Sequence, residues 1–206
     1  MAEAPWRTLI RDRWLLIVDK PSGWPVQPTR AGEANVYEAL SAAEPYVGLL
    51  HRLDRPASGC LLLTLDPTVN ARLAAGFREH TIERTYHAIL WGRVEDTTWD
   101  RPVGERPART HVRALGHGSG FTAAEITLEN GRTHQIRRHA AQAGHPIAGD
   151  RRYGGDAGRA WERLALHASA LALRHSVTGA PLEVHAPVPA DLAALWQLAG
   201  GTSHDA

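Results

Sequence analysis

Cysteine is nearly absent from this sequence: Cys60 is the only one in 206 residues. One thiol excludes an internal disulfide framework, and no Cys-x-x-Cys pair is present to hold zinc or an iron–sulfur cluster. We therefore expect a protein that works in a reducing compartment, the cytoplasm.

Long apolar runs are missing as well. The longest, at residues 14–18 and 60–63, are far shorter than the roughly 20 residues with which a helix spans a bilayer. The opening Met-Ala-Glu-Ala lacks the charged and then apolar pattern of a signal peptide. The sequence thus predicts a soluble protein with no membrane partner.

Lysine is also scarce, since Lys20 is the only one and the other 22 of the 23 basic residues are arginine. The net charge is +1, so any contact with nucleic acid needs a local basic patch. Arginine suits such a patch, because its planar guanidinium group pairs with phosphates, base edges and carboxylates. A GC-rich genome, which favours arginine and alanine codons, explains the same bias without a role in binding.

The chain is long enough for one substantial core, and we expect a single domain over residues 1–206 with its core at about 14–187. Short branched or alternating apolar runs predict strands at residues 14–18, 60–65, 86–92, 121–129 and 164–173. Apolar residues at helical spacing predict helices over 133–143 and 189–198, and a further helix that starts at Asp66. This mixture of strands and helices is typical of an α+β fold.

The predicted helix 133–143 is rich in arginine and has a narrow apolar face, formed by Ile136, Ala140 and Ala143. Gly144 stands at its end, where a glycine commonly terminates a helix in the left-handed conformation. Such a helix packs one narrow side on the core and directs its cations toward solvent or a ligand.

The most informative segment is residues 51–59, His-Arg-Leu-Asp-Arg-Pro-Ala-Ser-Gly, a turn-rich stretch just before an apolar run. It places Asp54 between Arg52 and Arg55. Neighbouring guanidinium groups favour the ionised carboxylate, which can then serve as a nucleophile or as an ion-pair partner. On its own, an aspartate flanked by arginines is more often a solvated turn residue than a catalytic one.

The pattern His-Arg-Leu-Asp-x-x-x-Ser-Gly resembles the active-site motif of the RluA-type pseudouridine synthases, which detach uracil from its ribose in RNA and rejoin it through carbon. Further segments follow in the order of that family, at residues 84–88, 131–139, 144–154 and 164–168. The resemblance implies the family's fold, a mixed and mostly antiparallel sheet with flanking helices and an active-site cleft across the sheet.

The resemblance also implies three catalytic residues. Asp54 matches the essential aspartate, Tyr86 matches a tyrosine that stacks on the target uracil and takes part in proton transfer, and Arg137 matches an arginine that pairs with the aspartate. Without the family, Tyr86 reads as a half-buried strand tyrosine, and the segment around Arg137 reads as a basic helix face in contact with phosphates or water. The resemblance further implies that Arg52 fills the space that the flipped-out base leaves.

A further set of residues is expected to bind the RNA substrate. They belong to the same motifs as the catalytic residues or to the late strand that lines the uracil pocket in the family: Arg52, Arg55, Arg132, His134, Gln135, Arg138 and Leu166.

The twelve histidines raise the question of a metal site. His134 and His139 are five residues apart, whereas two ligands on one helix face need a spacing of four, and no His-Glu-x-x-His segment occurs. A glycine-rich phosphate loop or a dinucleotide fingerprint is not present either. We expect neither a metal nor a cofactor.

Together these features predict an enzyme that isomerises specific uridines to pseudouridine in structured RNA, either tRNA or rRNA, and acts as a monomer. The target uridine must leave its stack, which favours loops, bulges and single strands. Asp54 breaks the glycosidic bond either by direct attack on the ribose or by deprotonating the sugar, and the sequence leaves both routes open.

Two features set this chain apart from many members of that family. The resemblance starts near Trp14, which leaves no room for the small RNA-binding domain that many members carry ahead of the catalytic domain. The connection 91–110 is also short, whereas many relatives insert a longer basic segment there. We therefore expect a compact RNA feature as substrate, either in a tRNA or in a small ribosomal hairpin.

Two other functions stay open at this point. A catalytically silent RNA-binding module would keep the arginines and the sheet, but it has no use for Asp54, Tyr86 and Arg137 together. A hydrolase that uses Asp54 and histidines would release free uracil instead of an isomer, so an assay for uracil separates it from a synthase.

Overall fold

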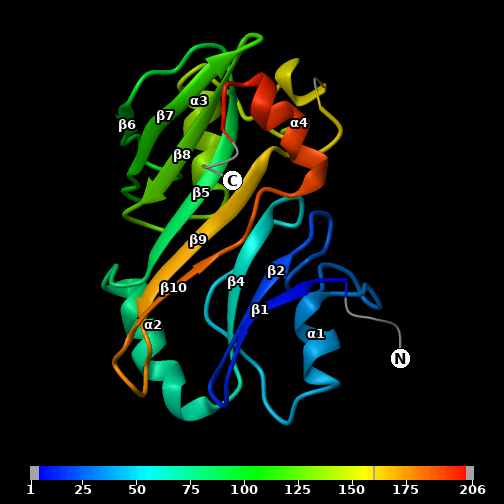
Figure 1. Cartoon of the computed structure of the whole chain (residues 1–206), viewed down its shortest axis with the longest axis vertical. Coiled ribbons are helices and arrows are strands. Elements are labelled where there is room, and N and C mark those ends of the chain that lie inside the picture. Colours follow the sequence, from blue (N-terminus) through cyan, green and yellow to red (C-terminus); the bar gives the residue numbers. More distant parts are fainter. Residues whose placement is uncertain (1–4, 160, 203–206) are drawn as a thin grey trace. The chain divides into compact units, whose positions relative to one another are not determined.

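The computed structural model of the protein describes residues 5–159 and 161–202. The chain divides into two compact units (Figure 1). The first unit comprises residues 1–83 and 170–186, and the second comprises residues 84–169 and 187–206. Each unit combines antiparallel strands with helices, so the α+β prediction is confirmed.

The sheet of the first unit is built around β2 (Leu15–Lys20) and β4 (Ser58–Thr64), which pair antiparallel. Every residue of β4 is buried. Burial on both faces explains why this strand is a continuous apolar run rather than an alternating one. β1 (Arg7–Arg11) pairs with β2, and β3 (Gly48–Leu49) pairs with β4.

Two helical segments complete the first unit. α1 (Val36–Ser41) begins at Asn35, whose side chain accepts a hydrogen bond from a backbone N–H of the first turn. The helix predicted at Asp66 is present but starts with a 3-10 turn, η1 (Pro67–Val69), before α2 (Asn70–Arg78). The Asp66 side chain caps that turn, as the sequence predicts.

β9 (Leu166–Arg174) runs through the boundary between the two units. Its later residues pair antiparallel with β10 (Pro181–His185) in the first unit. Its earlier residues belong to the second unit, where the Ser169 hydroxyl donates to the carbonyl of Thr85 at 3.3 Å.

The sheet of the second unit consists of β5 (Glu83–Trp91), β8 (Phe121–Leu128), β7 (Thr110–Gly118) and β6 (Thr97–Trp99), each antiparallel to its neighbour. The sequence predicts β5 and β8. It does not predict β7, because glycines, histidines and a register shift near Gly116 interrupt the alternation.

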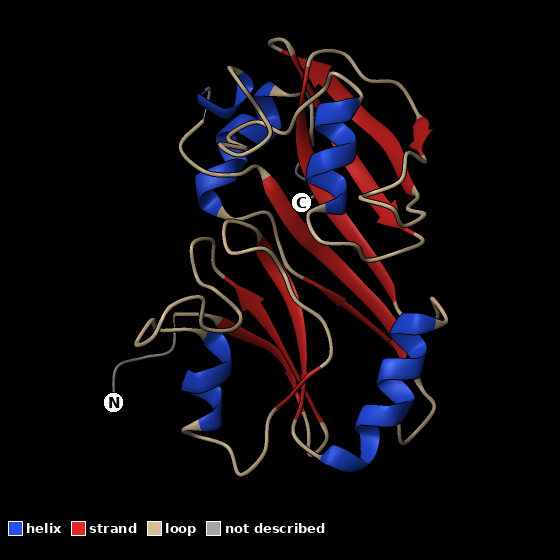
Figure 2. Cartoon of the chain, turned by 180° about the vertical axis from the view of Figure 1, so that it is seen from behind, coloured by secondary structure: helices blue, strands red, loops and turns tan. Residues whose placement is uncertain are grey.

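Two helices cover opposite faces of that sheet. α3 (Gln135–Gln142) lies behind it in Figure 1 and in front of it in Figure 2, and bonds to Thr110 of β7. α4 (Ala190–Leu198) packs on the other face, where Trp196 stacks on His87 of β5 with 4.7 Å between the ring centroids. The apolar face predicted for the helix at 189–198 is confirmed.

The prediction for α3 needs two corrections. The helix begins at Gln135 instead of residue 133, because His134 has the left-handed conformation, with φ 57°, and lies outside it. Ala143 was expected in the apolar face, but it is exposed, and only Ile136 and Ala140 are buried. Gly144 has φ +82° directly after the helix, as predicted.

Candidate active site

Asp54 lies in the loop between β3 and β4 of the first unit. The N–H of Ala57 donates to the Asp54 carbonyl at 3.0 Å, which closes a tight turn. Leu53 and Ala57 are buried on either side of it, Asp54 is half-buried and Arg52 is exposed. The turn therefore holds Asp54 at the edge of the core, two residues after the exposed Arg52.

Lys20 holds this loop from the end of β2. Its side chain is 0% exposed, and Nζ donates to the carbonyls of Pro21, Trp24 and Arg55 at 2.9, 2.8 and 3.2 Å. A buried ammonium group needs such acceptors, since burying an unpaired charge is very unfavourable. No role was predicted for Lys20 from the sequence. The one signal in the sequence is that Lys20 is the single lysine of an arginine-rich chain.

Further contacts join the Asp54 loop to the turn after β2. Ser22 Oγ donates to the Pro56 carbonyl at 2.8 Å, and Gly23 N–H donates to the Arg55 carbonyl at 2.9 Å. The side chain of Arg55 binds back, with Nε donating to the Gly23 carbonyl and Nη1 forming an ion pair with Glu33 at 2.6 Å. Arg55 thus makes contacts that hold the loop, while its side chain stays 55% exposed, and its contact with RNA stays a prediction.

Tyr86 points to the face of the second unit's sheet that α3 covers. It lies opposite Ile126, which in turn lies opposite Val112. Val112 and Thr110 are two residues apart and share a face, because side chains alternate along a strand. Thr110 bonds to α3, so the buried ring of Tyr86 is on the same side of this sheet as that helix.

Arg137 of α3 forms a buried ion pair with Asp150. Its Nε and Nη2 atoms donate to Asp150 Oδ2 and Oδ1 at 2.9 and 2.8 Å. Burial alone would raise the pKa of Asp150, but the hydrogen bonds and charge of Arg137, with the N–H groups of Tyr153 and Arg152, hold it below its ordinary value. Asp150 lies in the family-like segment 144–154, but no role was predicted for it from the sequence.

Tyr153 connects Arg137 to another predicted residue, His134. The guanidinium carbon of Arg137 lies 5.2 Å from the centre of the Tyr153 ring, and that of Arg152 lies at 5.4 Å. The Tyr153 hydroxyl and His134 Nδ1 are 2.9 Å apart. The left-handed conformation of His134 aims its ring at this tyrosine instead of along the helix. The structure therefore brings His134 and Arg137 together.

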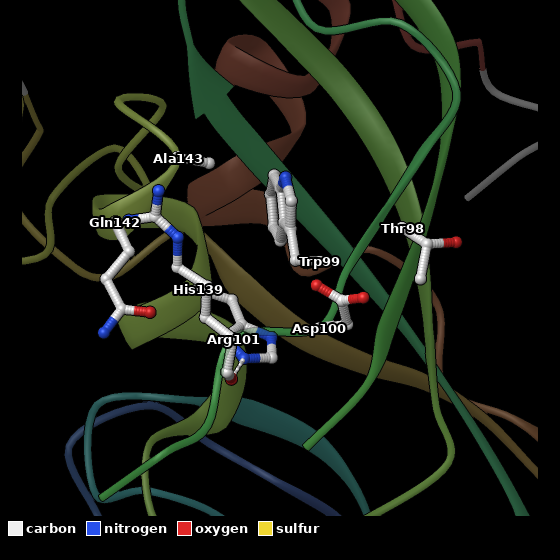
Figure 3. Close-up of a pocket in the computed structure, with 7 residues that line it drawn as sticks. All are labelled: Thr98, Trp99, Asp100, Arg101, His139, Gln142 and Ala143. Carbon is white, nitrogen blue, oxygen red and sulfur yellow. Dashed lines mark hydrogen bonds between the residues drawn. The ribbon is translucent and has the colours of Figure 1, made fainter. Parts of the chain in front are cut away.

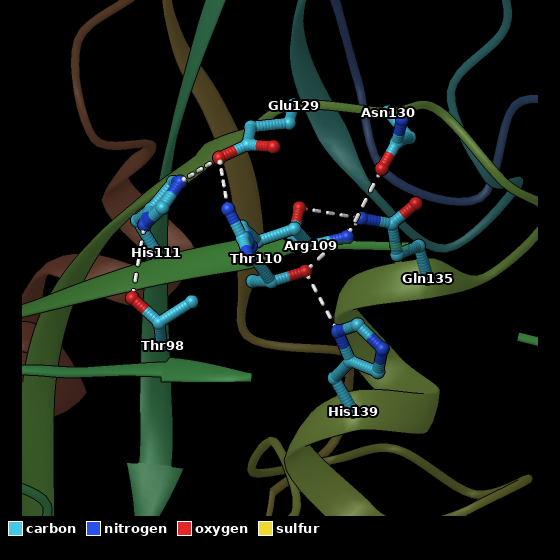
Figure 4. A network of polar contacts seen from close by, with 8 residues as sticks. All are labelled: Thr98, Arg109, Thr110, His111, Glu129, Asn130, Gln135 and His139. Atoms are coloured by element: carbon cyan, nitrogen blue, oxygen red, sulfur yellow. Dashed lines mark hydrogen bonds and ion pairs between the residues drawn. The ribbon is translucent and has the colours of Figure 1, made fainter. Parts of the chain in front are cut away.

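Gln135 joins the start of α3 to the start of β7 (Figure 4). Its Nε2 donates to the Arg109 carbonyl at 2.9 Å and to Thr110 Oγ1 at 3.1 Å, and its Oε1 accepts from the Arg132 N–H at 3.0 Å. The Gln135 side chain is buried and bonded to protein, so it positions the helix. A direct contact with substrate stays a prediction.

The other predicted binding residues lie at different depths. Arg138 and Arg132 are half-buried, and Arg132 Nε donates to the carbonyl of Pro107 at 3.3 Å. Leu166 is buried at the start of β9 in the second unit.

The thiol of Cys60 is unsuited to catalysis. Burial in β4, with the charge of Asp19, raises its pKa to about 12, so it stays protonated at neutral pH. Within residues 5–159 and 161–202, no group of three or more His, Cys, Asp or Glu side chains is arranged to hold a metal ion.

Comparison with known proteins decides the family. The family model described as RNA pseudouridylate synthase matches residues 14–142. The chain belongs to this family. The matched region contains Asp54, Tyr86 and Arg137, so all three lie in the part that the family shares.

Relatives and solved structures agree with this assignment. Ribosomal large subunit pseudouridine synthase D of Nitrosomonas europaea is 35% identical, over 98% of this chain and 68% of its own length. The Escherichia coli protein of the same name is 31% identical, over 95% and 71%. Human RNA Pseudouridylate Synthase Domain Containing 1 is 25% identical with a TM-score of 0.75, over 89% and 84% of the two chains.

The chain is therefore an RNA pseudouridine synthase of the RluA type, and the predicted fold is confirmed. Human RNA Pseudouridylate Synthase Domain Containing 4, at 19% identity and a TM-score of 0.79, shares that fold over 94% of this chain. No helix in the described residues is long and apolar enough to cross a membrane.

Proposed function

We propose that this pseudouridine synthase acts on ribosomal RNA of the large subunit. The observation that carries the proposal is the similarity, over nearly the whole chain, to relatives named for that substrate. A tRNA is the alternative substrate, because the sequence motifs resemble a family that acts on structured RNA in general. An RNA substrate of this kind is met in the cytoplasm, where we place the protein.

Asp54 is the proposed catalytic carboxylate and Arg137 its ion-pair partner, as the family resemblance implies. The C1′–N1 bond of the target nucleoside breaks while Asp54 either attacks the ribose or deprotonates the sugar. Uracil then turns and its C5 bonds to C1′, which breaks the bond between Asp54 and the ribose in the first route and returns the proton to the sugar in the second, while C5 loses a proton and N1 gains one. Tyr86 stacks on the uracil and takes part in that proton transfer. Asp150 orients Arg137 through their buried ion pair.

The remaining residues hold the RNA. Arg52, exposed beside Asp54, occupies the place that the uridine leaves when it flips out of its stack. Phosphates and the flipped base are the proposed partners of the other predicted side chains: Arg55, Arg132, His134, Gln135, Arg138 and Leu166. No cofactor takes part in this proposal.

We also propose that both units work as one catalytic domain in a monomer. The family match at 14–142 spans most of the first unit and much of the second. A single cooperative unfolding transition and a monomeric mass in light scattering are the expected results.

The test is to incubate purified enzyme, without added metal or nucleotide, with transcripts of large-subunit rRNA and of tRNAs, and then to separate the digested nucleosides. Separation is needed because isomerisation leaves the mass unchanged. Pseudouridine on rRNA, absent with Asp54→Asn, is the expected result. Pseudouridine on tRNA alone would refute the rRNA assignment, an active Asp54→Asn would refute the mechanism, and free uracil would indicate a hydrolase.

A further inference from the structure

A pocket of about 230 Å³ lies in the second unit, between the end of β6 and the last turn of α3 (Figure 3). Seven residues line it: Thr98, Trp99, Asp100, Arg101, His139, Gln142 and Ala143. The mechanism uses none of them, and the exposed Ala143 was expected in the core. Four of the seven lining residues belong to the connection 91–110, which we expect to be shorter than in many relatives.

Hydrogen bonds fix the backbone that forms this pocket (Figure 4). The ring of His139 is buried, with Nε2 at 2.7 Å from the Arg101 carbonyl and Nδ1 at 2.8 Å from Thr110 Oγ1. Because a carbonyl only accepts, Nε2 donates to it, and in the neutral ring Nδ1 accepts from the threonine. At the other end, Thr98 Oγ1 bonds to His111 Nδ1 at 3.0 Å.

Three polar side chains that line the pocket make no bond of this kind to the described residues. No hydrogen bond or ion pair within the described part of the chain engages the Asp100 carboxylate, the Arg101 guanidinium or the Gln142 amide. Figure 3 shows the Trp99 indole on one side of the space and the Arg101 side chain on the other, reaching toward Gln142. The Asp100 carboxylate lies beside the end of the Trp99 side chain that joins the backbone.

Such an arrangement matches a nucleobase. An indole offers a face on which any base can stack, and a guanidinium group can cover the opposite face or bind a phosphate. A carboxylate accepts hydrogen bonds and donates none, so Asp100 favours a base edge with N–H donors. Guanine presents two adjacent donors on its Watson–Crick edge, whereas uracil presents one.

We propose that this pocket binds an unpaired guanine nucleotide of the RNA substrate, at a position other than the target uridine. The inference rests on the proposed function only in taking RNA as the ligand. The base stacks on Trp99, Asp100 accepts from its N–H groups, and Gln142 contacts its remaining edge. Arg138 lies one turn before Gln142 on α3, where it binds the neighbouring phosphate.

The direct test follows the indole N–H signals of the Asp54→Asn enzyme by NMR while guanosine monophosphate or uridine monophosphate is added. The Trp99 signal is assigned as the one that disappears in Trp99→Phe. We expect it to shift with the guanine nucleotide at much lower concentration than with the uracil nucleotide. Asp100→Asn should remove that preference. The exposed Trp91, outside the pocket, should not shift.

A second experiment uses RNA in place of the mononucleotides. A hexauridylate and the same hexanucleotide with one guanine are added in turn, and the Trp99 signal is followed as before. In the active enzyme, Trp99→Ala should raise the KM for the RNA about 5- to 150-fold with kcat unchanged, as expected for the loss of one stacked base. Trp91→Ala is the matched control and should leave both constants unchanged.

The outcomes separate this inference from the proposed function. A Trp99 signal that responds to neither guanosine monophosphate nor the guanine-containing hexanucleotide overturns the guanine site, even if the enzyme makes pseudouridine. A guanine-specific shift in a protein that makes no pseudouridine supports the site and refutes the function. Equal shifts with both nucleotides would refute the guanine preference.

Discussion

Arg137 and Asp150 form a two-point ion pair in which both side chains are almost completely buried, at 7% and 0% exposed. Two parallel hydrogen bonds fix the plane of a guanidinium group as well as its position. The Asp150 carboxylate also accepts from the backbone N–H groups of Arg152 and Tyr153. The Asp150 carboxylate therefore orients Arg137, the proposed partner of the proposed catalytic residue Asp54, and shapes the segment that follows Asp150.

Asp150→Asn should lower the free energy of unfolding by about 3–5 kcal/mol, because the buried Arg137 charge loses its two-point ion pair with this carboxylate. Urea denaturation measures this change. The matched control is Asp156→Asn, which removes an ion pair with Arg159 in which both side chains are mostly exposed, at 93% and 78%. That variant should lose at most about 1 kcal/mol. Equal losses of unfolding free energy in the two variants would contradict the larger contribution assigned to the buried ion pair.

The same pair predicts how stability depends on pH. The pKa of Asp150 is lower in the folded protein than in the unfolded chain, so the unfolded state binds more protons in acid. The contribution of this carboxylate is fully present above about pH 4, the ordinary value for aspartate, and is lost as the pH falls through the folded-state pKa. Urea titrations from pH 7 to acid should show a steeper decline for wild type than for Asp150→Asn; parallel curves contradict the assignment.

The sequence predicts those parts of the protein whose signal is local. β2 and β4 each contain a continuous apolar run, and Gly144 marks the end of α3. The candidate catalytic residues were found because the nine-residue motif around Asp54 and the segments that contain Tyr86 and Arg137 resemble a family, since the charge pattern alone has a commoner explanation.

The parts that the sequence misses depend on contacts between distant segments. Asp150 becomes important through Arg137, thirteen residues away, and Lys20 through the Arg55 carbonyl. Lys20 is the single lysine and Asp150 lies in a family-like segment, but neither signal predicts these contacts. The left-handed conformation of His134 could not be predicted from the sequence either. Only its contact with Tyr153 shows why this non-glycine residue has a positive φ.

Lys20→Met should destabilise the protein by about 3 kcal/mol or more, because buried carbonyls lose their donors and each unsatisfied polar group costs about 1–3 kcal/mol. Methionine keeps most of the volume of the side chain. Ser22→Ala is the control, since it removes one hydrogen bond to the same loop, at Pro56, and should cost about 1 kcal/mol. Urea denaturation compares the two.

Turnover distinguishes a positioning role of Lys20 from a purely structural one. At a temperature where Lys20→Met is still fully folded by circular dichroism, kcat should fall at least about tenfold, a change of about 1.4 kcal/mol in the barrier, because the Asp54 loop is no longer held. Unchanged kcat in the folded fraction would limit Lys20 to stability.

Tyr86→Phe tests the hydroxyl of the proposed base-stacking tyrosine. The ring is buried on the α3 side of its sheet, and phenylalanine preserves that ring and its packing. We expect kcat to fall about 10²- to 10⁴-fold, the usual effect of removing a general acid or base, while the KM for RNA changes little because stacking persists. Tyr37→Phe, in α1 of the first unit, is the matched control and should behave as wild type. A raised KM with normal kcat would show instead that Tyr86 serves in binding alone, and the proton transfer would then have to be assigned to another group.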